Sequence, residues 1–330
     1  MAKRWFIIGS NSFSGASFIR HLLEQGVTAA GCSRSPEALD IFLPYKWIPQ
    51  APEFVFHQLD MNLDTGHIID AIRQHQAEYV VNFAAQSMVA ESWLYPDQWY
   101  QTNVVANVRL HEELRKIKAL KKYVHVTTPE VYGNCSGDVR ENTPFNPSTP
   151  YAASRAACDL HLLTFFKQYK FPVVFTRAAN VYGPGQQLYR IIPKTIFCIK
   201  SGIKLPLHGG GTSVRSFIHM NDVSRATRLI AEAGKSGECY HISTSHLVSI
   251  RELVEMTCSA MEVGFDDVVE LAGERPGKDS AYRLDSSKIR NDLGWQDNIT
   301  LQNGIAEVVV WMEKYWDQLK VLKPEYIHKP

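Results

Sequence analysis

The chain lacks a long uninterrupted apolar run, an excess of charge of one sign and a run of like charges. Its 35 Lys and Arg residues balance its 34 Asp and Glu residues, which leaves a net charge of +1 over 330 residues. Such a balance gives no electrostatic reason to expect nucleic acid or a membrane surface as a partner. The apolar stretch that follows Arg4 is too short for a signal peptide or a spanning helix. We therefore expect a cytoplasmic enzyme.

The chain also lacks paired cysteines. Its six cysteines are scattered, no two form a C-x-x-C pair, and no histidines cluster at zinc-ligand spacing. Disulfide frameworks and structural metal sites depend on such spacings. The sequence therefore predicts a reduced compartment, no disulfides and no metal.

Short β-like apolar runs alternate with amphipathic stretches in the first half of the chain. This alternation is typical of a parallel sheet covered by helices on both faces. Strands are predicted at residues 5–8, 27–32, 54–58, 79–82, 123–127 and 173–177, and helices at 13–25, 66–75, 97–118 and 151–169. Six such strands predict an α/β fold with a doubly wound parallel-sheet Rossmann domain.

The composition changes after Arg177. Glycine and proline interrupt shorter elements, as in Gly183-Pro184-Gly185, and helices are predicted at 250–261 and 301–316. We expect residues 1–178 to form the Rossmann domain, with the chain from about 213 to 245 returning to it. Residues 179–330 are expected to form a smaller C-terminal α/β domain for the substrate.

A small-residue turn joins the first predicted strand to the first predicted helix. At such a junction, backbone N–H groups and the helix dipole can receive a pyrophosphate. Gly9 and Gly15 have the spacing of the outer glycines in G-x-x-G-x-x-G, and Ser12 replaces the middle one. The residues expected to contact a dinucleotide here are Gly9, Asn11, Ser12, Phe13 and Gly15. An ordinary strand-to-helix turn is the alternative.

The end of the second predicted strand indicates which dinucleotide is bound. It reads Gly31-Cys32-Ser33-Arg34-Ser35, without the acid that usually binds the ribose hydroxyls of NAD. Ser33, Arg34 and Ser35 can instead hold a 2′-phosphate by hydrogen bonds and charge. NADP is therefore favoured, and NAD stays possible because some NAD enzymes also lack the acid. Further cofactor contacts are expected from Asp60, Met61, Phe83, Ala84 and Ala85.

Two later segments carry groups suited to acid–base chemistry. Thr128 and Glu130 follow the fifth predicted strand, at the sheet edge where open α/β folds bind ligands. Tyr151 and Arg155 are four residues apart and so share one helix face. A tyrosine beside a guanidinium and a positive nicotinamide has a lowered pKa and can act as a base toward a hydroxyl. A core tyrosine is the alternative.

These segments resemble the extended short-chain dehydrogenase/reductase family, of the nucleoside-diphosphate-hexose 4,6-dehydratase type. Residues 128–133, TPEVYG, are similar to the family's T-D-E-V-Y-G, and residues 148–155, STPYAASR, to its S-S-P-Y-S-A-S-K. Residues 82–87 and 102–104 stand where the family reads H-x-A-A-E-S and T-N-I. Residues 180–184, 215–219 and 275–279 are similar to N-N-Y-G-P, R-D-W-L-Y and R-P-G-H-D.

The resemblance implies roles for particular residues. Thr128 would bind the sugar O4, Tyr151 would take its proton as the C4 hydride leaves, and Glu130 would remove the C5 proton as water leaves C6. The hydride would then return to C6. The resemblance also implies that Thr102 contacts the cofactor and that the family's usual homodimer forms through the helices at 97–118 and 151–169. The substrate-binding residues that it implies are Ser87, Thr128, Glu130, Asn180, Arg190, Pro206, His208, Arg215 and Arg275.

Two positions depart from the family pattern. Pro129 stands where the family places an acid, and Arg155 where it places lysine. The leading interpretation is an NADP-dependent nucleotide-sugar 4,6-dehydratase that makes a 4-keto-6-deoxyhexose nucleotide. A second is an NADPH-dependent 4-keto-6-deoxysugar reductase, and a third is a non-catalytic protein that binds NADP and a nucleotide sugar. A C4 epimerase is disfavoured, because it would leave Glu130 without a role.

Overall fold

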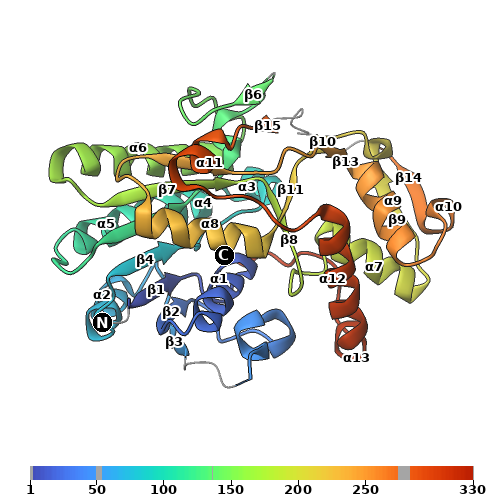
Figure 1. Cartoon of the computed structure of the whole chain (residues 1–330), viewed down its shortest axis with the longest axis horizontal. Coiled ribbons are helices and arrows are strands. Elements are labelled where there is room, and N and C mark those ends of the chain that lie inside the picture. Colours follow the sequence, from blue (N-terminus) through green and yellow to red (C-terminus); the bar gives the residue numbers. More distant parts are fainter. Residues whose placement is uncertain (1–2, 50–53, 136, 274–282, 330) are drawn as a thin grey trace.

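The computed structural model describes residues 3–49, 54–135, 137–273 and 283–329, and a seven-stranded parallel sheet lies at its centre (Figure 1). The strand order is β12-β7-β5-β4-β1-β2-β3. The strands are β1 (Trp5–Ile8), β2 (Ala29–Ser33), β3 (Phe54–Gln58), β4 (Tyr79–Asn82), β5 (Lys122–Val126), β7 (Val173–Ala178) and β12 (Cys239–Ile242). From β1 the chain winds to β2 and β3 in one direction and to β4, β5 and β7 in the other. Loops therefore diverge at the carboxyl ends of β1 and β4, where such sheets bind ligands.

The predicted fold class is confirmed, but the predicted number of strands is wrong. The predictions at 5–8, 54–58 and 79–82 match β1, β3 and β4, whereas β2 begins two residues later than predicted. The structure adds β12, which pairs in parallel with β7. This strand reads CYHI, and its polar atoms are buried against distant partners: the His241 ring bonds the Tyr132 hydroxyl. A short strand of this composition shows no apolar run.

Helices cover both faces of the sheet. One face carries α1 (Phe13–Glu24), α8 (Met220–Ala233) and α11 (Ser287–Leu293), and the other carries α2 (Thr65–Gln74), α5 (Asn107–Leu114) and α6 (Pro150–Tyr169). Phe18, Val223 and Ile289 pack in the first apolar layer, and Ile68, Leu110 and Leu162 in the second. These helices bury the centre of the sheet, since all residues of β1 and β4 are buried, whereas the edge strand β3 is partly exposed.

The helix predicted at 97–118 is not one continuous α-helix. The chain forms α3 (Val89–Leu94), α4 (Pro96–Tyr100), a π-helical segment η3 (Gln101–Ala106) and then α5. The buried Asn107 side chain donates to the carbonyls of Thr102 and Asn103, at 3.0 and 3.2 Å. A side chain that enters the backbone ladder in this way is a known cause of local helix widening.

A second group of elements lies beside the carboxyl edge of the sheet (Figure 1). Its helices are α7 (Ile191–Ser201), α9 (Ile250–Ala260), α10 (Phe265–Val268), α12 (Leu301–Lys314) and α13 (Trp316–Leu319). Its strands are β9 (Leu205–His208) with β14 (Val269–Ala272), and β10 (Val214–Arg215) with β13 (Val248–Ser249). Ile196, Leu253 and Val308 share its apolar core. The pair β8 (Asn180–Tyr182) and β11 (Phe217–His219) and the pair β6 (Asp138–Val139) and β15 (Arg283–Leu284) complete the strands.

Among the described residues, each helix is too short or too polar to cross a membrane.

Buried histidines predict that acid destabilises the fold. Burial lowers the pKa of His219 to about 4 and that of His241 to about 3, from an ordinary 6.5. The unfolded chain takes up protons near pH 6.5 while the folded chain does not, so this stability is present above that pH and is lost as the pH falls toward 4. We expect the free energy of unfolding to fall by about 1 kcal/mol per pH unit for each histidine. Urea titrations at about pH 8, 7, 6 and 5 measure it, and equal midpoints at the two lowest values would contradict it.

Candidate functional site

A cleft of about 1210 Å³ opens at the carboxyl edge of the sheet. The segments that follow β1, β2, β3, β4 and β5 form one side of it, and residues from β8, β10 and the start of α7 form the other. Pockets for one small ligand usually measure roughly 300–1,000 Å³. The cleft can therefore hold a dinucleotide together with a second ligand.

The turn after β1 forms the floor of the cleft, and at Gly9 it lies close to the backbone of Ala84. Gly9 has a φ of +82°, and a Cβ at this residue would lie 2.6 Å from the backbone nitrogen of Ala84. Ser12 caps α1: its hydroxyl accepts from the Gly15 N–H at 3.0 Å and donates to the Gly9 carbonyl at 2.7 Å. A side chain at residue 12 thus closes the turn that the predicted motif closes with glycine. Together these contacts leave the start of α1 open toward the cleft, as an anion site requires.

The residues predicted to bind the cofactor are brought together, with one exception. Gly15 packs within the turn, where a Cβ would lie 2.2 Å from the Gly9 carbonyl oxygen, and it does not line the cleft among the described residues. The others all line it: Gly9, Asn11, Ser12, Phe13, Ser33, Arg34, Ser35, Asp60, Met61, Phe83, Ala84, Ala85, Thr102, Tyr151 and Arg155. The predicted strand-end positions therefore converge on one surface.

Hydrogen bonds fix the rim of the cleft beside β2. The Ser33 hydroxyl accepts from the Asn11 backbone N–H at 2.9 Å, and the Asn11 amide donates to the Ser35 carbonyl at 3.0 Å. The Arg34 guanidinium donates through Nη2 to the Lys329 carbonyl at 2.9 Å. Ser33 and Arg34 thus stand together at the position where a dinucleotide presents its adenosine ribose.

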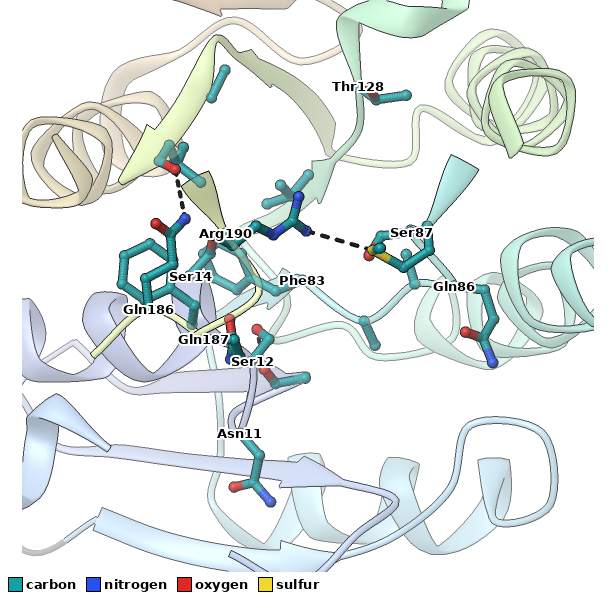
Figure 2. A pocket seen from close by; sticks show the side chains of 18 of the residues that line it. Asn11, Ser12, Ser14, Phe83, Gln86, Ser87, Thr128, Gln186, Gln187 and Arg190 are labelled. Carbon is teal, nitrogen blue, oxygen red and sulfur yellow. Dashed lines mark hydrogen bonds between the residues drawn. The ribbon is translucent and has the colours of Figure 1, made fainter. Parts of the chain in front are cut away.

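The predicted substrate residues divide into three groups. Ser87, Thr128, Glu130, Asn180, Arg190 and Arg215 line the cleft. In Figure 2 the Arg190 side chain points across the pocket toward the loop that carries Ser87. Pro206 and His208 lie on β9, which pairs with β14, and they are outside the lining among the described residues. Arg275 lies outside the residues that the structure describes.

Several residues that line the cleft were not predicted from the sequence motifs. Gln86, Gln186, Gln187, Tyr189 and Lys329 all line the cleft. Gln86 lies inside a segment that the family pattern covers, so this segment is the one signal that could have indicated it. Lys329 is 295 residues from Arg34, the residue to which it is bonded. No local pattern predicts a contact of that separation.

The local backbone explains the proline at residue 129, between Thr128 and Glu130. Thr128 caps a single 3₁₀ turn, η4 (Pro129–Tyr132), and its Oγ1 accepts from the Glu130 N–H at 3.3 Å. The first position of a helical turn needs no backbone donor, which is why it tolerates proline. Pro129 therefore fixes the turn that places Glu130 in the cleft wall, and its side chain offers no proton to a ligand.

Tyr151 is buried in the cleft wall at the start of α6, with 8% of its surface exposed. Burial raises the pKa of its phenol, whereas the charge of Arg155 and a hydrogen bond with the Thr128 side chain oppose that rise. A further positive charge in the cleft would lower the pKa again. A cation bound there would therefore favour the phenolate.

Arg155 reaches from α6 to the end of β5. It is 2% exposed, and its Nη2 donates to the Val126 carbonyl. Its Nε and Nη1 have no hydrogen-bond partner within the described chain, although Arg155 lines the cleft. Buried donors of a charged group are rarely left unpaired. Since both nitrogens are enclosed, the Arg155 side chain would have to turn before it could offer them to a bound cofactor.

We expect the Arg155→Lys variant to retain or raise kcat for the dehydration expected from the sequence. Lysine keeps the positive charge that opposes the raised pKa of Tyr151, and its smaller ammonium can turn toward the cleft. Arg155→Met removes the charge, and it should lower kcat at neutral pH about tenfold or more, because a rise of one pKa unit lowers the phenolate population tenfold. Steady-state rates of the two variants from about pH 6 to 10 test this. Loss of activity in the lysine variant would show a site adapted to arginine.

A buried hydrogen-bond network holds the segment that carries Thr128 and Glu130 against α6 and β7. Asp159 on α6 accepts from Arg177 Nη2 at 2.7 Å and from Thr127 Oγ1 at 3.1 Å, and both charged side chains are at most 3% exposed. Arg177 also donates through Nη1 to the Tyr132 hydroxyl at 2.6 Å. Since Tyr132 ends η4 and Thr127 precedes it, the network ties the turn with Glu130 to α6 and β7.

A cluster of possible metal ligands lies in the same layer. Ligand atoms of His111, His125 and Cys158 lie within 4.8 Å of one another in the buried interior. Arg155 and Arg177 also lower the pKa of His125 by their positive charge. The same charge opposes a metal cation, so the cluster is better explained as core packing around the Tyr123 hydroxyl, which bonds both rings.

The parallel sheet, the turn after β1 and the wall of Thr128, Tyr151 and Arg155 define a dinucleotide-dependent enzyme of the extended short-chain dehydrogenase/reductase class. Comparison with known families agrees with this class and narrows it. Residues 6–308 match the family described as GDP-mannose 4,6 dehydratase, and the chain belongs to this family.

Named relatives span nearly the whole chain. A dTDP-glucose 4,6-dehydratase of Streptomyces antibioticus is 32% identical, over 95% of this chain and 94% of its own. One of Xanthomonas campestris pv. campestris is 30% identical, over 93% of this chain and 92% of its own. The structure also superposes on a dTDP-glucose 4,6-dehydratase of Streptomyces venezuelae, solved with NAD bound, with a TM-score of 0.88 and 29% identity. That match covers 97% of this chain and 100% of the other.

Proposed function

We propose that the protein is an NADP-dependent nucleoside-diphosphate-hexose 4,6-dehydratase whose product is a 4-keto-6-deoxyhexose nucleotide. The observation that carries the proposal is the shared cleft. Thr128, Glu130, Tyr151 and Arg155 lie in its wall, and the turn that begins at Gly9 lies in its floor. The family to which the chain belongs supports the same reaction class.

The cleft's residues fit a nicotinamide dinucleotide. The close approach at Gly9 and the capped start of α1 are features that such a cofactor requires, and Arg155 adds a positive charge to the cleft wall. When bound, it would accept a hydride from C4 of the sugar and later return it to C6. The protein's own residues would bind the sugar and move the protons.

Proton movements follow from the positions of three side chains. Thr128 would hold the sugar O4 while the Tyr151 phenolate takes its proton. The C4 ketone then acidifies the C5 proton, which Glu130 would accept. Because Pro129 has no donor, Glu130 would pass that proton to the leaving C6 hydroxyl, which departs as water. When the hydride returns to C6, C5 must take up a proton again, and the proton that Tyr151 removed from O4 balances this uptake.

Preference for NADP is supported by the rim beside β2. Ser33, Arg34 and Ser35 line the cleft there and offer hydroxyls and a guanidinium to a 2′-phosphate. Fluorescence titration with NADPH and NADH should give the tighter dissociation constant for NADPH, and Arg34→Ala should reduce the difference. Equal or tighter NADH binding would favour NAD, the cofactor in the Streptomyces venezuelae structure.

One incubation tests the reaction class. The purified protein with NADP is mixed separately with GDP-mannose, dTDP-glucose, UDP-glucose, CDP-glucose and UDP-GlcNAc. The molecular mass of each product is then measured by mass spectrometry. We expect one nucleotide sugar to lose one water without net consumption of NADPH. Loss of no water from any of them would refute the proposal. In a separate incubation with NADPH and a 4-keto-6-deoxysugar nucleotide, consumption of NADPH would favour the reductase. Binding of NADP and a nucleotide sugar without turnover would favour a non-catalytic role.

A homodimer is part of the proposal. Large apolar side chains are exposed along α3, α4, η3 and α6, namely Trp93, Leu94, Tyr95, Tyr100, Val105 and Leu160. Several large apolar side chains exposed on neighbouring helices support an interface there. Sedimentation equilibrium measures the mass directly, and a monomer at micromolar concentration would contradict this part of the proposal.

A further inference from the structure

The last described residues cross the cofactor cleft. The Lys329 carbonyl accepts one hydrogen bond from Arg34 Nη2 and another from Gln86 Nε2, both at 2.9 Å. Arg34 follows β2 and Gln86 follows β4, and β1 lies between these two strands in the sheet. The turn that begins at Gly9 therefore lies between the two anchors. A pyrophosphate bound on that turn would lie beneath the Lys329 carbonyl.

Aromatic contacts hold the same segment on both sides. The His328 ring stacks on Tyr95 and on Trp99, with centroids 5.4 and 5.3 Å apart, and its Nε2 lies 2.6 Å from Gln98 Oε1. Tyr326 meets the edge of Tyr189 at 5.3 Å. Tyr189 lines the substrate side of the cleft, whereas Trp99 belongs to α4. The segment is thus anchored to both sides of the cleft and to its rim.

The side chain of Gln86 is chemically suited to this contact. An amide can donate to a carbonyl oxygen, whereas a carboxylate at the same position can only accept. Gln86 is 5% exposed, and its backbone is fixed by the Asn103 amide, which accepts from the Gln86 N–H and donates to its carbonyl, both at 2.9 Å. The donor is therefore presented from a rigid position.

We propose that Tyr326, His328 and Lys329, held by contacts that include Gln86 and Arg34, are cofactor-positioning residues that retain the dinucleotide between removal of the hydride and its return. This role rests on the proposed function, because only a reaction that returns its hydride needs the same cofactor molecule at both steps. Loss of the reduced cofactor in mid-cycle would strand a 4-keto sugar that still carries its C6 hydroxyl.

The test compares variants of the full-length protein. Gln86→Glu removes the donor with little change of shape, His328→Ala removes the stacked ring, and a chain that stops after Glu325 removes the segment. Ile327→Ala is the matched control, because this side chain lies in the same segment and is 69% exposed. Melting temperatures show whether each variant folds.

The first readout is the dissociation rate of NADPH or NADH from the binary complex, measured by stopped flow without a sugar. We expect the truncation and His328→Ala to raise it about tenfold or more and Gln86→Glu to raise it severalfold, since one lost hydrogen bond shifts an equilibrium by up to about tenfold. The control should leave it unchanged. An unchanged rate in all three folded variants would overturn the proposal, and so would faster association alone, which indicates a segment that blocks the cleft.

The second readout is made during turnover. The variants should release free reduced cofactor together with the 4-keto intermediate, whereas the wild type should release neither. If no sugar is dehydrated, the proposed function fails while the dissociation rates still report on the segment. If dehydration proceeds but the variants retain the cofactor as the wild type does, the segment's role fails alone.

Discussion

Replacing Tyr151 with phenylalanine is expected to lower kcat for dehydration by roughly 10²–10⁴-fold, the usual contribution of a positioned general base. The phenylalanine ring can occupy the same buried site at the start of α6. It lacks the hydroxyl that contacts Thr128 and that would take the proton from the sugar O4. Without that base oxidation of the C4 hydroxyl would be slow, and it would limit every later step.

The measurement separates chemistry from binding. Single-turnover experiments with saturating sugar should show slow reduction of the cofactor, while dissociation constants for cofactor and nucleotide sugar stay within a few-fold of wild type. Phe165→Tyr is a useful control, because it alters an aromatic residue of the same helix that lies outside the cleft lining among the described residues. A Tyr151→Phe protein with kcat within tenfold of wild type would remove Tyr151 as the base.

Asp159→Ala is expected to lower the free energy of unfolding by about 3–5 kcal/mol. This is the usual cost of removing one partner of a buried ion pair and leaving the other charge buried without compensation. The Arg177 guanidinium would keep its charge in the interior without its carboxylate, and Thr127 would lose its acceptor. Urea titration gives the value. Asp317→Ala is the control, because the pair of Asp317 with Lys320 is exposed, and such pairs usually contribute less than about 1 kcal/mol.

A double variant tests the reason for that loss. If the unpaired charge causes it, Asp159→Leu with Arg177→Met should be more stable than Asp159→Leu alone, because the second change removes the buried charge. A double variant that is less stable by the sum of both single losses would show that the two residues act independently. Both results measure how much the ion pair of Asp159 and Arg177 contributes to the stability of the structure around the turn with Glu130.

The sequence predicts most of the cleft because its residues follow strand ends. Gly9, Ser33, Asp60, Phe83 and Thr128 each come shortly after a predicted strand, and parallel strands present their carboxyl ends at one edge. Local patterns are sufficient for such positions. No side-chain contact has to be known in advance.

The remaining features depend on contacts between distant residues. His241 is buried in β12 because Tyr132 and the Asp285 carbonyl satisfy its ring nitrogens, and neither partner is near it in sequence. The resemblance implies a role for Pro206, which lies on β9, paired with β14, and is outside the lining of the cleft among the described residues. Periodicity and motifs carry no information about these pairings.

The rigid hold on η4 limits the stereochemistry of the reaction. Tyr132 is fixed by Arg177 and His241, so the backbone of the turn that carries Glu130, two residues earlier, is held in place. Since Pro129 cannot share its work, one carboxyl group must reach both the C5 hydrogen and the C6 oxygen. The two bonds would then break in a syn elimination, so the site would have to hold the rotatable C5–C6 bond with its hydroxyl on the same side as the C5 hydrogen.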